Sequence, residues 1–87
     1  MSMAMQLREM RDKAWAENQL LYVDTDIGKG ILEKIDRGVL HLLVADEQTF
    51  EWKDGKPVFN HREGRPISYF LVDLERYTGS VITTKSS

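Results

Sequence analysis

The chain contains no cysteine. This absence excludes disulfides, thiol nucleophiles, cysteine-based zinc fingers and iron–sulfur clusters. Small secreted domains usually need disulfides, so the absence favours a reducing compartment. No apolar run reaches the roughly 20 residues that a transmembrane helix requires. Charged side chains follow Met5 where a signal peptide would have its apolar segment. We therefore expect a cytoplasmic protein without membrane contact; whether Met1 and Ser2 are native stays open.

The chain also lacks an excess of either charge. It has 12 Lys and Arg residues against 14 Asp and Glu residues, a formal net charge of -2. Residues 1–43 and residues 44–87 each carry six basic and seven acidic side chains. Without a basic arm or an acidic tail, global attraction to nucleic acid is missing, although a local basic patch remains compatible with this balance.

The length of 87 residues indicates one domain. A domain of this size buries only about 60–65% of the surface that its unfolded chain exposes, so its core is thin. This disfavours a pocket enclosed by core and favours a surface shared with a partner or with a second copy. No linker or repeat divides the chain, so we predict a single domain over residues 1–87, with residues 84–87 as a frayed tail.

Residues 3–19 have the apolar spacing of an amphipathic helix. One interpretation is a surface helix laid over a sheet. The other is a dimer-forming helix, because a methionine-rich stripe with heptad-like spacing suits a partner helix. The candidate oligomer face consists of Met3, Leu7, Met10 and Ala14.

Short strands follow the helix. Residues 20–23 are either its last turn or a short strand, and residues 31–37 fit a helix or a strand, with strand favoured. Further predicted elements are a buried strand over 39–45, a hairpin over 49–60 with its turn at residues 54–57, a strand over 67–75, a turn over 77–80 and a short strand over 81–83.

Short connections favour antiparallel pairing. The predicted fold class is therefore α+β: an N-terminal amphipathic helix followed by a small antiparallel sheet, or a curled barrel, of four to six short strands.

Two glycine-containing segments partly resemble known ion-binding motifs but lack residues that those motifs require. Asp24 to Gly28 begins like a calcium loop, but Gly28, Lys29 and Ile35 occupy the fifth, sixth and twelfth positions, where an oxygen ligand, Gly and Glu are needed. Gly28-Lys29-Gly30 matches neither phosphate-loop pattern. We interpret this region as an ordinary turn.

The two histidines do not define a catalytic or metal site. His41 lies within an apolar strand, which favours a structural role in the sheet, and His61 lies in a polar loop. A metal site needs three or more converging ligands. We therefore predict no metal, no cofactor and no catalytic residue.

Residues 50–69 interleave aromatic and basic side chains, the combination that single-stranded nucleic-acid platforms use. Acidic residues Glu51, Asp54 and Glu63 interrupt it. The aromatic residues are also those that a thin core most needs. The candidate binding surface consists of Trp52, Lys53, Lys56, His61, Arg62, Arg65 and Tyr69.

From the sequence we expect a small non-enzymatic interaction protein: a regulator, adaptor or inhibitor that binds another protein or itself through its surface. A nucleic-acid-binding module that uses residues 50–69 is the alternative. A third hypothesis is a small enzyme or ligand-binding subunit whose site forms between chains.

Overall fold

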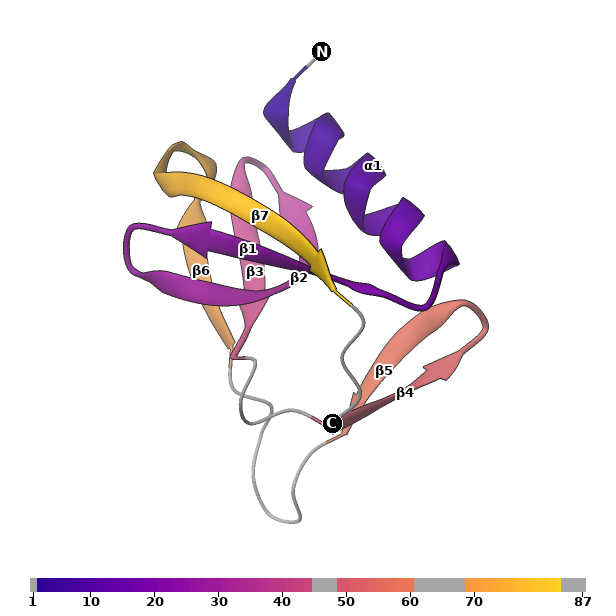
Figure 1. Cartoon of the computed structure of the whole chain (residues 1–87). Coiled ribbons are helices and arrows are strands. Elements are labelled where there is room, and N and C mark those ends of the chain that lie inside the picture. The colour runs from indigo at the N-terminus through magenta and orange to yellow at the C-terminus, as the bar shows by residue number, and fades with distance from the viewer. Residues whose placement is uncertain (1, 45–48, 61–68, 84–87) are drawn as a thin grey trace.

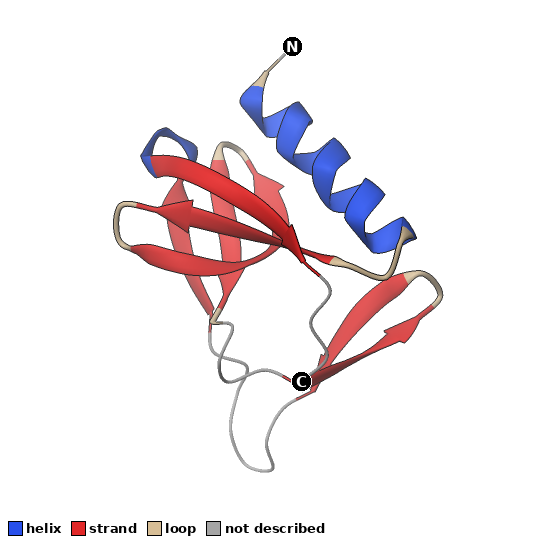
Figure 2. Cartoon of the chain, in the orientation of Figure 1, coloured by secondary structure: helices blue, strands red, loops and turns tan. Residues whose placement is uncertain are grey.

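The computed structural model describes residues 2–44, 49–60 and 69–83. It confirms the α+β class: one α-helix precedes antiparallel strands, and the curled sheet does not close into a barrel (Figures 1 and 2). Within these residues the strands number seven, five in the main sheet and two in a separate hairpin, against the predicted four to six. The elements are α1 (Met3–Ala16), β1 (Leu20–Thr25), β2 (Gly28–Asp36), β3 (Val39–Leu43), β4 (Thr49–Lys53), β5 (Lys56–Asn60), β6 (Tyr69–Asp73), the 3-10 helix η2 (Leu74–Arg76) and β7 (Tyr77–Thr83).

The ends of α1 have local causes. Ser2 is the N-cap, and its hydroxyl accepts a hydrogen bond from the Met5 backbone N–H at 3.2 Å. At the other end Asn18 has a φ of 57°, in the left-handed region, so the chain leaves the helix there. The helix is three residues shorter than predicted. Residues 20–23, which the sequence left open between a last helical turn and a short strand, belong to strand β1.

Five strands form the main sheet in the order β6-β3-β2-β1-β7, with every pair antiparallel. The two edge strands, β6 and β7, are joined in the sequence by the three residues of η2 alone. Because so short a link must join opposite edges, the sheet curls (Figure 1). Hydrogen bonds hold η2 to both neighbouring turns: the Leu74 N–H donates to the Gly38 carbonyl at 2.9 Å, and the Asp26 N–H donates to the Arg76 carbonyl at 3.2 Å.

The predicted turn at residues 77–80 is wrong. Tyr77 begins a strand that continues to Thr83, and η2 makes the change of direction instead. A register shift against β1 leaves Thr78 as an extra residue in β7. Tyr77 packs against the core, and this contact fixes the start of the strand.

Two hairpins close in two-residue turns, and the second turn is shorter than the predicted 54–57 because Lys56 and Pro57 already belong to β5. Arg37-Gly38 joins β2 to β3, and Asp54-Gly55 joins β4 to β5; all four residues have φ between 52° and 77°. Positive φ at both central residues is the conformation of a type I′ turn, whose twist matches that of the paired strands. The structure thereby confirms residues 31–36 as strand and residues 49–60 as a hairpin.

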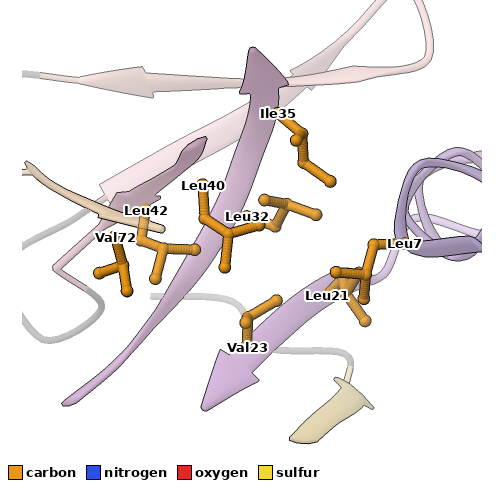
Figure 3. Packing of buried hydrophobic residues seen from close by; sticks show 8 residues of the cluster. All are labelled: Leu7, Leu21, Val23, Leu32, Ile35, Leu40, Leu42 and Val72. Atoms are coloured by element: carbon orange, nitrogen blue, oxygen red, sulfur yellow. The ribbon is translucent and has the colours of Figure 1, made fainter. Parts of the chain in front are cut away.

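The main sheet buries side chains on both faces. On the inner face, which α1 covers, lies the larger cluster (Figure 3). On the outer face, residues of β1, β2 and β3 pack against aromatic side chains of the β4–β5 hairpin. The inner cluster consists of Leu7, Leu21, Val23, Leu32, Ile35, Leu40, Leu42 and Val72. In the described part of the chain, no helix has both the length and the apolar character needed to cross a bilayer.

Candidate interaction surface

Five residues, one from each strand, form an apolar row across the outer face of the sheet. Tyr69 pairs with Leu43, Leu43 with Ile31, Ile31 with Tyr22, and Tyr22 with Val81. Directly paired residues project from the same face, so this outer row is continuous from edge to edge. Its three central members are buried, whereas Tyr69 is 63% exposed and Val81 is 53% exposed.

The β4–β5 hairpin covers only the middle of the outer row. Phe50, Trp52 and Phe59 pack against the cluster that its three buried members form with Leu20. The Phe50 ring contacts the Trp52 ring edge-on with centroids 5.6 Å apart, and the Phe59 ring at 5.5 Å. These three rings therefore hold the hairpin on the sheet and leave the two ends of the row open.

Within the described residues, the edge strand β6 lacks a bulge, a proline and a lysine, three of the features that commonly protect a sheet edge. It pairs with β3 through five consecutive partners without a bulge. Its sequence, Tyr-Phe-Leu-Val-Asp, holds no proline, glycine, lysine or arginine. On the outer face it presents Tyr69 and Leu71, and Leu71 is 52% exposed. An edge of this kind is a template for pairing with another strand.

The opposite edge, β7, is better protected. The register shift at Thr78 inserts a bulge into its pairing with β1, and Gly79 follows directly. Bulges increase local twist and turn an edge away from a flat partner. The exposed apolar side chains Val81 and Ile82 lie beyond this bulge.

The predicted binding residues do not form one described surface. Trp52 is half-buried against the main sheet, so its ring is not a free stacking platform. Lys53 and Lys56 are exposed and paired next to the hairpin turn. Tyr69 lies on the edge of the other sheet. His61, Arg62 and Arg65 lie outside the described residues, as does the predicted tail at 84–87.

The chain's own sheet covers most of the methionine-rich helix stripe. Leu7 and Ala14 are buried, and Met10 packs against the inner cluster. Only Met3, at 44% exposure, remains substantially open. The contacts therefore match the interpretation of a surface helix over a sheet, and they leave little of the stripe for a partner helix.

A groove of about 660 Å³ lies between α1, β2 and the β4–β5 turn. Arg11 lies over the Trp15 ring, 4.6 Å from its centroid, and donates a hydrogen bond to the Glu33 carbonyl at 2.7 Å. The Trp15 indole nitrogen is buried without a hydrogen-bond partner among the described residues. Three basic and three acidic side chains line the groove, so it favours no ligand of definite charge: Arg11, Lys34 and Lys56 against Asp12, Glu33 and Asp54.

The segment that resembled a calcium loop is the β1–β2 turn. The Thr25 hydroxyl donates to the Gly28 carbonyl at 2.7 Å and accepts from the Ile27 N–H at 3.3 Å. Threonine thus closes the turn with its side chain, in agreement with the turn interpretation. Within residues 2–44, 49–60 and 69–83, no three acidic or histidine side chains are grouped as metal ligands would be.

Comparison with known proteins adds no relative: no protein family, no characterised protein and no solved structure matches the chain. The site therefore rests on the structure alone. Sequence reasoning included Tyr69 but missed Leu71 and the open edge. The apolar residues at every position from 69 to 72 gave no signal for an edge, because such a run predicts cover on both faces of a strand.

Proposed function

We propose that the protein is a non-enzymatic interaction module that binds another polypeptide strand through the edge of β6. One observation carries the proposal: β6 is an edge strand that pairs without a bulge, holds no proline, glycine or lysine, and presents two exposed apolar side chains, Tyr69 and Leu71. Natural proteins rarely leave such an edge open without a partner.

The physical basis is strand addition. A bound strand would satisfy the outward backbone N–H and C=O groups of β6, and these hydrogen bonds supply affinity for any extended segment. Side chains of the bound strand would pack beside Tyr69 and Leu71, which supplies selectivity for apolar residues at alternating positions. The chemistry expected of the partner is therefore an extended, alternately apolar strand.

Nucleic-acid binding has weaker support. Phe50, Trp52 and Phe59, the aromatic part of that hypothesis, pack against the sheet. Lys53 and Lys56 remain exposed, but Asp54 lies between them in the chain. We therefore treat nucleic-acid binding as an outcome of the test below.

The test compares two matched variants in affinity capture from native extract, with and without nuclease. Leu71→Lys places a charge on the β6 edge, and Ile27→Lys places the same charge on an exposed apolar site in the β1–β2 turn. We expect the wild-type chain to capture a polypeptide in stoichiometric amount, and nuclease treatment should not release it. The Ile27→Lys variant should still capture this polypeptide, and the Leu71→Lys variant should not. Capture that both variants retain equally, or that nuclease abolishes, contradicts the proposal.

A further inference from the structure

We infer that the strand bound by β6 is β6 of a second copy, paired antiparallel about a two-fold axis through Leu71. This inference rests on the proposed function, because it names the partner of the same edge. Such a dimer would join two five-stranded sheets into one continuous sheet.

The β6 sequence is self-complementary in this register. Antiparallel pairing about Leu71 sets Tyr69 opposite Asp73 of the second copy and Phe70 opposite Val72 of the second copy. The inner-face residues Phe70 and Val72 both pack with the inner cluster, so this pairing continues the apolar inner face of one copy into the other. On the outer face, the exposed Leu71 side chain of one copy would contact Leu71 of the second copy at the centre of the interface.

The charge on β6 does not oppose two-fold pairing of β6 with β6. Asp73 is its single charged residue. In the two-fold register the two Asp73 side chains stand at opposite ends of the paired strands, four residues apart. That separation is about 13 Å along a strand, longer than the screening length of about 8–10 Å at physiological salt. Like-charge repulsion across the interface is therefore small.

Pairing of β6 with β7 of another copy is the competing arrangement. It would bring a bulge-free edge against one interrupted at Thr78 and Gly79. It is also a head-to-tail contact that yields a ring or an open filament, whereas the two-fold contact closes on itself. The structure favours the two-fold pairing because both of its strands have a regular edge.

Because the paired strands have only five residues each, we expect the interface to bury less than the roughly 1,200 Å² of a standard stable complex. We therefore expect reversible association that depends on protein concentration.

Cross-linking tests the register directly. The chain has no cysteine, so Leu71→Cys introduces a unique thiol. A residue on the two-fold axis faces its own copy with Cα atoms about 4.5–5.5 Å apart, within the range of about 4.4–6.8 Å that a disulfide requires. Ile27→Cys, equally exposed at 54%, is the matched control.

The expected result is disulfide-linked dimer from Leu71→Cys under mild oxidation, formed at least tenfold faster than from Ile27→Cys. Sedimentation should show wild-type dimer that Leu71→Lys converts to monomer and Ile27→Lys does not. Equal cross-linking rates for the two thiols, with a wild-type monomer at concentrations on the order of 1 mM, overturn the inference. In a mixture of the Leu71→Cys and Val81→Cys variants, preferential formation of the mixed disulfide dimer over the Leu71→Cys homodimer also overturns the inference, in favour of β6–β7 pairing.

The two proposals can fail separately. If the wild-type chain is monomeric but captures another polypeptide that Leu71→Lys releases, the β6 edge binds a partner and the partner is not a second copy. If neither self-association nor capture depends on Leu71, the proposed function fails as well.

Discussion

Leu32 and Ile35 lie in the same inner cluster although they are three positions apart along β2. In a regular strand that spacing would place them on opposite faces. A register shift between Leu32 and Lys34 provides the reason: Glu33 is an extra residue that the pairing with β3 skips. The backbone of the extra residue is therefore free of the ladder, and Arg11 of α1 donates a hydrogen bond to its carbonyl at 2.7 Å.

Replacement of Arg11 should loosen the helix from this bulge. Arg11→Met keeps an unbranched apolar stem but removes the hydrogen bond to Glu33 and the contact over Trp15. We expect a loss of about 1–2 kcal/mol in the free energy of unfolding, measured by urea denaturation. Lys13→Met, on the exposed side of the same helix, is the control and should change stability by less than about 0.5 kcal/mol. Equal effects of the two substitutions would show that the bulge contact does not hold the helix.

Truncation of Leu7 should show that the sheet, and not a partner, covers the helix stripe. Leu7 is fully buried in the inner cluster, beside Leu21 (Figure 3). Leu7→Ala should cost about 2–5 kcal/mol, whereas Met3→Ala, at an exposed position of the same stripe, should cost less than about 1 kcal/mol. Urea denaturation at several protein concentrations provides the measurement. If the cost of Leu7→Ala vanished in dilute solution, the stripe would instead belong to an interface between chains.

The bulge at Glu33 explains why the sequence left residues 31–37 ambiguous. Spacing of i and i+3 between Leu32 and Ile35 is a helical signal, and only the bulge converts it into one face of a strand. Local signals were sufficient elsewhere: the turns at Gly38 and Gly55 have the positive φ that their residue types suggest.

The open edge could not be predicted because strand order is a property of the tertiary fold. The run from Tyr69 to Val72 is apolar at every position, which is typical of a central strand with both faces covered. The structure places β6 at an edge instead, with the outer-face side chains uncovered. Likewise, grouping residues 50–69 by their proximity in sequence joined Trp52 and Tyr69, which belong to different sheets.

Removal of the Phe50 ring should release the β4–β5 hairpin from the outer row. Phe50 contacts the rings of both Trp52 and Phe59. Phe50→Ala should therefore destabilise the protein by about 2 kcal/mol, below the range for a fully buried Phe because Phe50 is only half-buried. In a Trp15→Phe background, Trp52 fluorescence should shift to longer wavelength as the indole becomes hydrated. Val58→Ala, at an exposed hairpin position, is the control and should leave the spectrum unchanged; an unshifted spectrum in Phe50→Ala would contradict this docking.

A methyl group at position 30 should strain the curl of the sheet. A Cβ on Gly30 would lie 2.8 Å from the Leu42 Cβ, 2.9 Å from the Leu43 carbonyl oxygen and 3.2 Å from a ring carbon of Phe70. Two of these three atoms are fixed to the backbone of β3, so β2 and β3 would have to move apart. Since β3 also pairs with β6, the displacement would reach the proposed binding edge.

We therefore expect Gly30→Ala to reduce the free energy of unfolding by about 1–3 kcal/mol. The matched control is Gly79→Ala, because the nearest atom to its added Cβ is 3.9 Å away, in ordinary contact with Asp24. It should change stability by about 0.5 kcal/mol or less. Urea denaturation followed by far-UV circular dichroism gives both values. A Gly30→Ala protein as stable as Gly79→Ala would mean that the sheet opens at this point without cost, and that the tight approach of β2 to Phe70 does not maintain its curvature.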